Sequence, residues 1–126
     1  MTLWSVLIVD DSATIRGIIC KLFMSEGDFE VCGEAENGQQ AIAKALELKP
    51  ALIVTDLSMP VMNGLVATRI LRKLMPNVPI ILYSAHIDPY VEKEALAAGA
   101  STVVPKSDAV AVLIGKSRQL LDDVAA

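Results

Sequence analysis

The sequence predicts an α/β protein with a doubly wound parallel sheet of five strands. Short runs rich in Val, Ile and Leu alternate with longer stretches whose apolar residues recur three and four positions apart. This alternation repeats five times, and the apolar runs begin near residues 4, 29, 51, 80 and 102. Such a pattern is typical of parallel strands connected by helices that cover both faces of the sheet.

The first unit joins a buried strand to an amphipathic helix. Residues 4–9 are apolar almost throughout, as expected for a strand covered on both faces. The polar residues within 11–14 supply side chains that can cap a helix. The helix then has one apolar stripe, formed by Ile15, Ile18, Ile19, Leu22 and Phe23. Gly27 ends this unit.

The second and third units have the same design. The second strand is predicted over 29–35, and Asn37-Gly38 turns the chain into a helix that Pro50 closes. The apolar face of this helix consists of Ala41, Ile42, Ala45 and Leu46. The third strand, 51–55, leads through a loop with Pro60 and Asn63-Gly64 to another helix. Its apolar side includes Leu65, Leu71 and Leu74.

The last two units have shorter predicted strands. The fourth strand is predicted over 80–83, and a helix over about 90–98 ends at Gly99, which is a typical residue after a helix C-terminus. The fifth strand is predicted over 102–104. The last helix has one apolar face, formed by Val110, Leu113, Ile114, Leu120, Leu121 and Val124.

Right-handed crossovers leave few topologies for five such units. We expect the strand order 2-1-3-4-5 of a flavodoxin-like (βα)5 fold, which is common at this size. The 126 residues match one domain of ordinary size, so we expect a single domain over 1–126. No linker, low-complexity tract or block of like charges interrupts the pattern.

Composition excludes several classes of protein. Apolar residues make up 53% of the chain, which is too many for a disordered protein. The net charge is −4, whereas a protein that binds nucleic acid or anionic membranes typically has a basic surface. No apolar run approaches the roughly 20 residues of a membrane-spanning helix, and the first run has no basic residue before it, unlike a secretory signal. Cys20 and Cys32 are interpreted as buried small hydrophobic residues in a reducing cytoplasm.

Polar side chains with complementary chemistry follow the predicted strands. Asp10 and Asp11 end the first strand, Asp56 ends the third, Ser84 ends the fourth and Lys106 follows the fifth. These four strands are neighbours in the expected order, and ligands of open α/β sheets bind at the carboxyl ends of the strands. We therefore expect three carboxylates, a hydroxyl and an ammonium group to share one rim of the sheet.

This combination suits a magnesium-dependent phosphoryl transfer. Carboxylates that lie close together repel one another and need cations, of which Lys106 provides one. Oxygen ligands favour Mg²⁺ (or Mn²⁺), and the absence of His and Cys from these strand ends argues against zinc. Asp56 is the best candidate nucleophile because its strand lies between the Asp pair and Ser84. It would attack phosphorus and form an aspartyl phosphate.

The same residues resemble the receiver domain of two-component response regulators. The resemblance extends over essentially the whole chain, and its motifs are specific when taken together. The matching segments are residues 6–12, 54–60, 62–64, 82–85 and 99–100, together with Lys106.

The resemblance implies a role for each acidic residue of the rim. Asp56 corresponds to the phosphoacceptor, and it also contacts the metal. Asp11 corresponds to a direct metal ligand, and Asp10 to an acidic partner that acts largely through metal-bound water. The backbone carbonyl of Ser58 corresponds to the third protein ligand of the metal.

Ser84 corresponds to the switch hydroxyl of the family, and Lys106 to the lysine that contacts the phosphoryl group. Two residues depart from the family pattern. Val103 stands where an aromatic residue is usual, so the usual aromatic readout is not expected. Ser107 stands where proline is usual, and a cis bond to a residue other than proline costs about 2.5–4 kcal/mol. We therefore expect the Lys106–Ser107 bond to be trans.

The resemblance also implies partners. The phosphodonor would be a phosphohistidine of a sensor histidine kinase or a histidine phosphotransfer protein. The chain would be a stoichiometric phosphoacceptor with intrinsic autodephosphorylation, not a turnover enzyme. The fourth helix, fifth strand and fifth helix would contact an output domain or form a homodimer, with no nucleic acid bound by this domain and no membrane contact.

Three alternatives remain to be compared with this interpretation. One is a receiver-like interaction module that never carries phosphate, although it would not need all five polar residues. A flavin-binding electron carrier of the same architecture is disfavoured because Asp10-Asp11 would repel an anionic phosphate and aromatic residues make up 4% of the chain. A phosphatase with an Asp-x-Asp loop is disfavoured because neither 10–12 nor 56–58 has the second acid.

Overall fold

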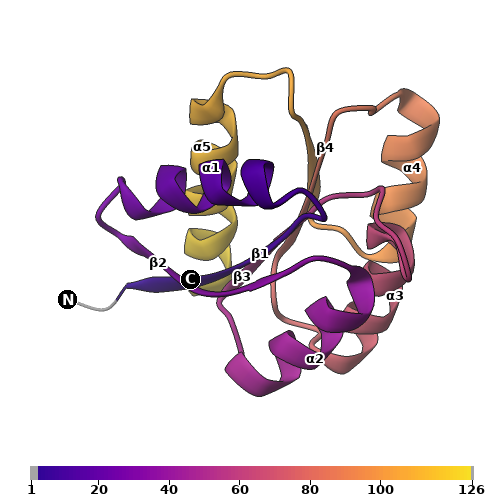
Figure 1. Cartoon of the computed structure of the whole chain (residues 1–126), viewed down its shortest axis with the longest axis horizontal. Coiled ribbons are helices and arrows are strands. Elements are labelled where there is room, and N and C mark those ends of the chain that lie inside the picture. Colours follow the sequence, from indigo (N-terminus) through magenta and orange to yellow (C-terminus); the bar gives the residue numbers. More distant parts are fainter. Residues whose placement is uncertain (1–2, 126) are drawn as a thin grey trace.

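The computed structural model describes residues 3–125, in which five strands and five helices alternate along the chain (Figure 1). The strands are β1 (Trp4–Val9), β2 (Phe29–Ala35), β3 (Leu52–Thr55), β4 (Ile80–Ser84) and β5 (Thr102–Pro105). The helices are α1 (Ala13–Met24), α2 (Gly38–Leu48), α3 (Gly64–Leu74), α4 (Pro89–Ala98) and α5 (Val110–Ala125). None of the helices within 3–125 combines the length and apolar character that crossing a membrane requires.

The strands form one parallel sheet in the order β2-β1-β3-β4-β5, which confirms the predicted fold. Helices α1 and α5 cover one face of the sheet, and α2, α3 and α4 cover the other (Figure 1). Val9 at the end of β1 pairs with Thr55 at the end of β3. The residues that follow these two strands therefore emerge next to each other.

The core has two main parts because successive residues of a strand point to opposite faces. In β1, Val6 and Ile8 pack toward α1 and α5, whereas Leu7 and Val9 pack toward α2 and α3. All four are essentially inaccessible to water, as the run of apolar residues in this strand predicts. Burial on both faces makes the central strands a rigid base for the residues at their ends.

Polar residues define the ends of the helices. Ser12, Asn37, Asn63 and Asp88 cap α1, α2, α3 and α4, and each side chain accepts a hydrogen bond from the backbone N–H three residues later. Helix α4 ends at Gly99, whose φ of 114° lies in the left-handed region that favours glycine. The sequence indicated Asn37 and Asn63 as turn residues, and the structure shows that they are also helix caps.

Several apolar side chains are less buried than the sequence predicts, and they are Ile18, Leu46, Leu74, Val110 and Val124 of the helices and Cys32 of β2. The buried stripe of α1 is centred on Ile19, Cys20 and Phe23, which leaves Ile18 at its margin and 56% exposed. The prediction of a buried Cys32 is also wrong, because this residue is half-buried at a bulge of the edge strand β2. Val6 and Leu7 are consecutive in β1, whereas Cys32 separates their partners Val31 and Gly33 in β2. The Cys32 thiol donates a hydrogen bond to the carbonyl of Val6 at 3.5 Å.

Burial raises the pKa of both thiols, that of Cys20 to about 11. Neither Cys20 nor Cys32 is therefore a thiolate at neutral pH, and both behave as the inert apolar residues that the sequence suggested.

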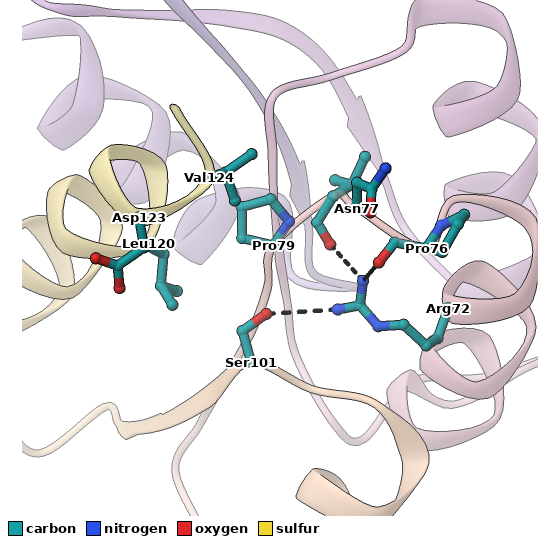
Figure 2. Close-up of a pocket in the computed structure, with 9 residues that line it drawn as sticks. Arg72, Pro76, Asn77, Pro79, Ser101, Leu120, Asp123 and Val124 are labelled. Carbon is teal, nitrogen blue, oxygen red and sulfur yellow. Dashed lines mark hydrogen bonds between the residues drawn. The ribbon is translucent and has the colours of Figure 1, made fainter. Parts of the chain in front are cut away.

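Arg72 connects several elements at the end of the sheet where β4 and β5 begin, opposite the carboxyl ends of the strands. Its Nε donates to the carbonyl of Gly99 at 2.9 Å, and Nη1 donates to the carbonyls of Pro76 and Val78 at 3.0 and 2.8 Å. Nη2 reaches Ser101 Oγ at 3.4 Å (Figure 2). This guanidinium joins the C-terminal ends of α3 and α4 and lines a shallow pocket beside α5. Its acceptors are uncharged, so we regard Arg72 as structural.

Candidate functional site

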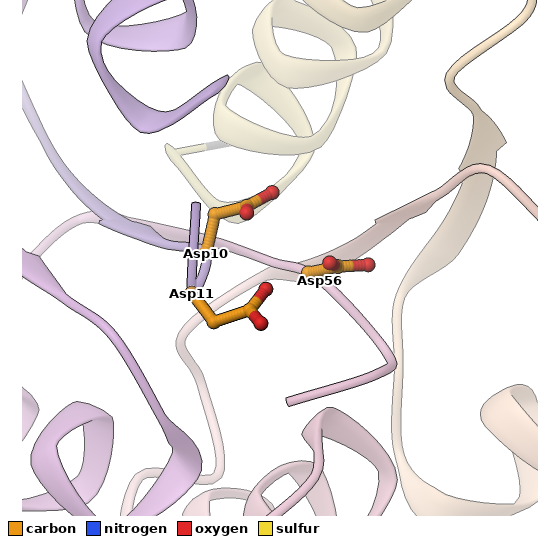
Figure 3. A group of neighbouring side chains, drawn as sticks. All are labelled: Asp10, Asp11 and Asp56. Carbon is orange, nitrogen blue, oxygen red and sulfur yellow. The ribbon is translucent and has the colours of Figure 1, made fainter. Parts of the chain in front are cut away.

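The carboxyl ends of β1 and β3 bring three aspartates together (Figure 3). Asp10, Asp11 and Asp56 each offer a carboxylate oxygen, and these atoms lie within 4.8 Å of one another. The backbone N–H of Asp56 donates to the carbonyl of Val9 at 2.9 Å, so the ladder between β1 and β3 continues to the site itself. The structure thus places these three predicted residues at one point of the rim.

The two neighbouring aspartates of the first loop have different surroundings. Asp10 is 1% exposed, and its Oδ1 accepts from the N–H of Ser12 at 2.9 Å. Its Oδ2 accepts from Lys106 Nζ at 2.8 Å. Asp11 is exposed and forms no side-chain hydrogen bond or ion pair within 3–125. Asp10 is therefore a fixed anion inside the site, whereas Asp11 has its oxygens available for a ligand.

Lys106 is the cation of the site. Its Nζ lies 2.8 Å from Asp10 and 3.4 Å from Asp56, and 5.9 Å from the centre of the Tyr83 ring. Burial opposes the charge of this ammonium, but the hydrogen bond with Asp10 and the charge of Asp56 outweigh it and raise the pKa of Lys106. Lys106 is therefore protonated at neutral pH.

Two departures from the family pattern, Val103 and Ser107, lie close to Lys106 in the chain. None of the peptide bonds within 3–125 is cis, so the Lys106–Ser107 bond is trans, as expected. The N–H of Lys106 donates to the carbonyl of Ser84 at 2.8 Å, which continues the pairing of β4 with β5. Val103 packs against Leu82 beneath α4, on the face of the sheet away from α1 and α5.

Ser84 is the buried last residue of β4. Its Oγ accepts a long hydrogen bond of 3.5 Å from the N–H of His86. Within the described residues the Ser84 Oγ forms no hydrogen bond with Asp56 or with Lys106, and its one contact is with its own loop. A small rotation of the side chain would release this weak contact.

The loop between β3 and α3, which contains Ser58, is held at both ends. Gly64 donates its N–H to the carbonyl of Leu57 at 2.8 Å, and Gly38 at the start of α2 donates to the carbonyl of Met62 at 2.8 Å. The sequence placed Gly64 in the loop before the third helix. The structure shows a stronger requirement, because a Cβ at this position would overlap the carbonyl oxygen of Asp56.

The surroundings of Asp56 disfavour the ionised form of its carboxyl group. Burial raises its pKa above the ordinary value of 3.8, and the negative charge of Asp10 adds to this effect, while Lys106 opposes it. A backbone hydrogen bond of 2.8 Å from Leu57 to Oδ1 also favours the ionised form, but it is not sufficient to reverse the shift. Burial is the main cause of this shift, and with three carboxylates beside one ammonium group the site also holds more negative charge than its own cation neutralises.

This charge excess predicts that Asp56→Asn stabilises the protein when no divalent cation is present. An acid whose pKa is raised by folding costs stability above its unfolded-state value, so the parent loses stability as the pH rises from about 4 toward neutrality. We expect the variant to melt a few degrees higher than the parent at pH 7 in EDTA, and the difference to shrink below pH 4. The same measurement on Asp122→Asn, an exposed residue of α5, should show no change. A variant that melts at or below the parent at pH 7 would contradict the charge excess.

The donor set fits Mg²⁺. Three carboxylates lie close enough to share one ion, and Ser58 follows two residues after Asp56 in the adjacent loop, so that its carbonyl is near in the chain. Neither His nor Cys belongs to this cluster, which distinguishes it from a zinc site. The single positive charge of Lys106 leaves room for a further cation.

Comparison with known proteins agrees with this geometry. A model of the response regulator receiver domain matches residues 6–117. The chain belongs to the response regulator receiver domain family. Such domains are signalling modules of two-component systems, which the resemblance in the sequence predicted. Receiver domains typically bind Mg²⁺ and carry phosphate at an acidic pocket, and the acidic cluster of this receiver domain could hold such an ion.

Relatives of this receiver domain include both short and long proteins. The chemotaxis protein CheY of Thermotoga maritima is 42% identical over 101 residues, which cover 80% of this chain and 83% of CheY. A protein-glutamate methylesterase/protein-glutamine glutaminase of Nocardioides sp. is 41% identical over 103 residues, which cover 80% of this chain but 28% of the relative. A similar protein of Hahella chejuensis is 38% identical over 98% of this chain and 32% of its own length. The chain thus spans about a third of these longer relatives.

Solved structures show the same fold. The response regulator domain of Thermotoga maritima CheB has a TM-score of 0.90 and 32% identity, with 95% of this chain and 97% of that domain covered. A complex of CheX and CheY with BeF3 and Mg from Borrelia burgdorferi has a TM-score of 0.86 and 27% identity, with 99% of this chain and 91% of that chain covered.

Proposed function

We propose that this receiver domain accepts a phosphoryl group on Asp56, in a reaction that requires Mg²⁺, and thereby switches a surface that binds a partner. One observation carries the proposal above all others. The Asp56 carboxylate lies beside two further carboxylates and 3.4 Å from a single ammonium group, at the carboxyl end of the sheet. A carboxylate in this setting can act as a nucleophile, and Lys106 together with a bound Mg²⁺ would neutralise the phosphoryl group.

The proposed transfer starts from a phosphohistidine. An oxygen of Asp56 attacks phosphorus, the P–N bond breaks, and its electron pair stays on the imidazole nitrogen, which then takes up a proton. Lys106 stays charged and can follow the phosphoryl oxygens, because its ammonium already contacts Asp56. Asp11, Asp56 and the Ser58 carbonyl would hold Mg²⁺, which supplies positive charge to the phosphoryl oxygens when bound. Asp10 would act on it largely through water.

The switch would begin at Ser84 and Lys106. Phosphorylation replaces the Asp56 carboxylate with a group of about −1.5 to −2 charge and three strong acceptors, which can draw the Ser84 hydroxyl away from its weak contact with His86. Movement of the loop after β4 would then alter the surface of α4, β5 and α5. Since Val103 has no ring to rotate, we expect displacement of this loop to carry the signal.

The partners follow from this chemistry. The phosphodonor would be a sensor histidine kinase or a histidine phosphotransfer protein, and the chain would act as a stoichiometric acceptor. The α4-β5-α5 surface would contact an output domain or a second copy. Longer relatives named as methylesterases make an attached effector domain one candidate for this partner.

Labelling with a small phosphodonor tests the proposal. We expect acetyl phosphate with Mg²⁺ to add one phosphoryl group to the parent, as seen by intact-protein mass spectrometry, and EDTA to prevent it. Asp56→Asn should remain unlabelled, whereas Asp122→Asn should be labelled like the parent. A parent that takes up no phosphoryl group from acetyl phosphate or from a phosphorylated histidine kinase would favour an interaction module instead. An Asp56→Asn variant that is labelled normally would refute the assigned acceptor.

A further inference from the structure

Arg16 forms a hydrogen bond with the backbone of the loop that contains Asp10 and Asp11. This residue lies in the first turn and a half of α1, and its side chain is 17% exposed. Its Nη1 donates to the backbone carbonyl of Asp10 at 2.7 Å, and its Nε donates to Glu34 Oε1 of the edge strand β2 at 2.9 Å. The guanidinium therefore bridges the end of β1 and the end of β2 beside the three aspartates.

The carbonyl that Arg16 binds belongs to the peptide that joins Asp10 to Asp11. Because a peptide unit is planar, a hydrogen bond to its oxygen fixes the orientation of the whole unit, including the nitrogen of Asp11. Asp10 is held at its other atoms as well, through the carbonyl of Ala35, the N–H of Ser12 and the ammonium of Lys106. The hydrogen bond from Arg16 to the Asp10 carbonyl is a further contact that holds this residue.

Asp11 depends on this backbone. Its side chain forms no hydrogen bond or ion pair within the part of the chain that the structure describes. The direction of its carboxylate toward Asp56 is therefore set by the peptide before it, together with the start of α1. Loss of the hydrogen bond from Arg16 would allow this peptide to rotate and would move Asp11 without unfolding the sheet.

We propose that Arg16 is a positioning residue for the metal site, which keeps the Asp11 carboxylate within reach of the ion shared with Asp56. This inference rests on the proposed function. Residues that orient metal ligands without touching the metal typically change its affinity by about 10–100-fold when they are replaced. The planar guanidinium suits this position because its Nε and Nη1 are two separate donor atoms in a fixed geometry, which reach Glu34 and the Asp10 carbonyl, whereas all donors of an ammonium group share one nitrogen.

Magnesium titration distinguishes positioning from a merely structural role. We expect Arg16→Met to bind Mg²⁺ about 10–100-fold more weakly than the parent by isothermal titration calorimetry. At saturating Mg²⁺, the rate of labelling by acetyl phosphate should return to within about threefold of the parent, because the nucleophile itself is unchanged. Arg16→Lys should recover part of the lost affinity.

A matched control separates the two hydrogen bonds of Arg16. In Glu34→Gln the amide oxygen can still accept from Nε, and the contact with Asp10 remains, so Mg²⁺ affinity should stay within about threefold of the parent. A second measurement needs no metal. Hydrogen exchange of the Ser12 amide, which donates to Asp10 Oδ1, should become faster in Arg16→Met but not in Glu34→Gln.

The outcomes separate this inference from the proposed function. If Arg16→Met binds Mg²⁺ like the parent while Asp56→Asn abolishes labelling, Arg16 has no positioning role but the phosphoacceptor stands. If Arg16→Met loses Mg²⁺ affinity only in proportion to a general loss of folded protein, measured by its melting curve, the inference is overturned as well. If Asp56→Asn is labelled normally, the proposed function fails independently of Arg16.

Discussion

Gly64→Ala is expected to destabilise the protein by about 3 kcal/mol or more and to distort the site around Asp56. The first turn of α3 approaches the backbone that follows β3 so closely that a Cβ on Gly64 would overlap the carbonyl oxygen of Asp56 and lie 3.1 Å from the Cα of Leu57. Overpacking typically costs about 1–3 kcal/mol where side chains can adjust. Here the opposing atoms are backbone, which cannot rotate away.

The displacement would also reach the candidate site. The N–H of Gly64 donates to the carbonyl of Leu57, and this bond holds the loop that contains Ser58. Chemical unfolding of Gly64→Ala measures the loss of stability, and acetyl phosphate labelling measures the loss of reactivity. We expect labelling to fall even under conditions in which most of the variant is folded.

Two other glycines provide a control for this substitution. Gly17 in α1 and Gly115 in α5 are helical, and an added Cβ at either position would meet no atom within 4 Å. Alanine should stabilise these positions by about 0.5–1 kcal/mol, because glycine loses more conformational freedom in a helix. If Gly64→Ala stabilised the protein as much as Gly17→Ala, this result would contradict the close approach of α3 to the carbonyl of Asp56.

Lys106→Met is expected to cost about 3–5 kcal/mol in the absence of divalent cations. The substitution removes the ammonium that lies 2.8 Å from Asp10 and leaves the buried carboxylate without a counter-charge. Loss of one partner from a buried ion pair typically has this effect. Asp56 would be affected less, because it is half-buried and its contact with Lys106 is longer.

Magnesium should reverse part of this loss, since a divalent cation supplies the missing positive charge. Urea unfolding of Lys106→Met in EDTA and in Mg²⁺ measures both effects, and the stabilisation by Mg²⁺ should exceed that of the parent. The loss in EDTA should shrink in the double variant with Asp10→Asn, because the buried charge is then absent. Lys116→Met, at an exposed position of α5, should change stability by less than about 0.5 kcal/mol. Equal stability of Lys106→Met and the parent in EDTA would show that Lys106 is not the counter-cation of Asp10.

The composition of the site could be predicted from the sequence because the fold could be predicted first. Five alternations of apolar period led to a parallel sheet, and the order of its strands placed Asp10, Asp56 and Lys106 at one rim although Lys106 lies 96 residues after Asp10. This inference needed only local patterns and the general rules for parallel sheets. The start of α1 was similarly readable from its polar cap, whereas Asn37 and Asn63 were recognised as caps only in the structure.

Differences between similar residues could not be predicted in this way. Asp10 and Asp11 are adjacent and identical in type, yet one is buried against Lys106 and the other is exposed. Cys32 lies in an apolar run but at a bulge of β2. A periodic pattern does not reveal such features, because they depend on register and on the local path of the backbone.

By itself, the sequence determined the fold class, the rim of the sheet at which the polar side chains gather and the types of residue found there, because apolar periodicity and strand ends are local properties. The tertiary structure alone decided that Arg16 binds the carbonyl of Asp10 and that α3 leaves no space for a side chain on Gly64. The physical reason is that both features are contacts between atoms of different elements. Their distances are set by how the helices pack on the sheet, and no pattern along the chain encodes them directly.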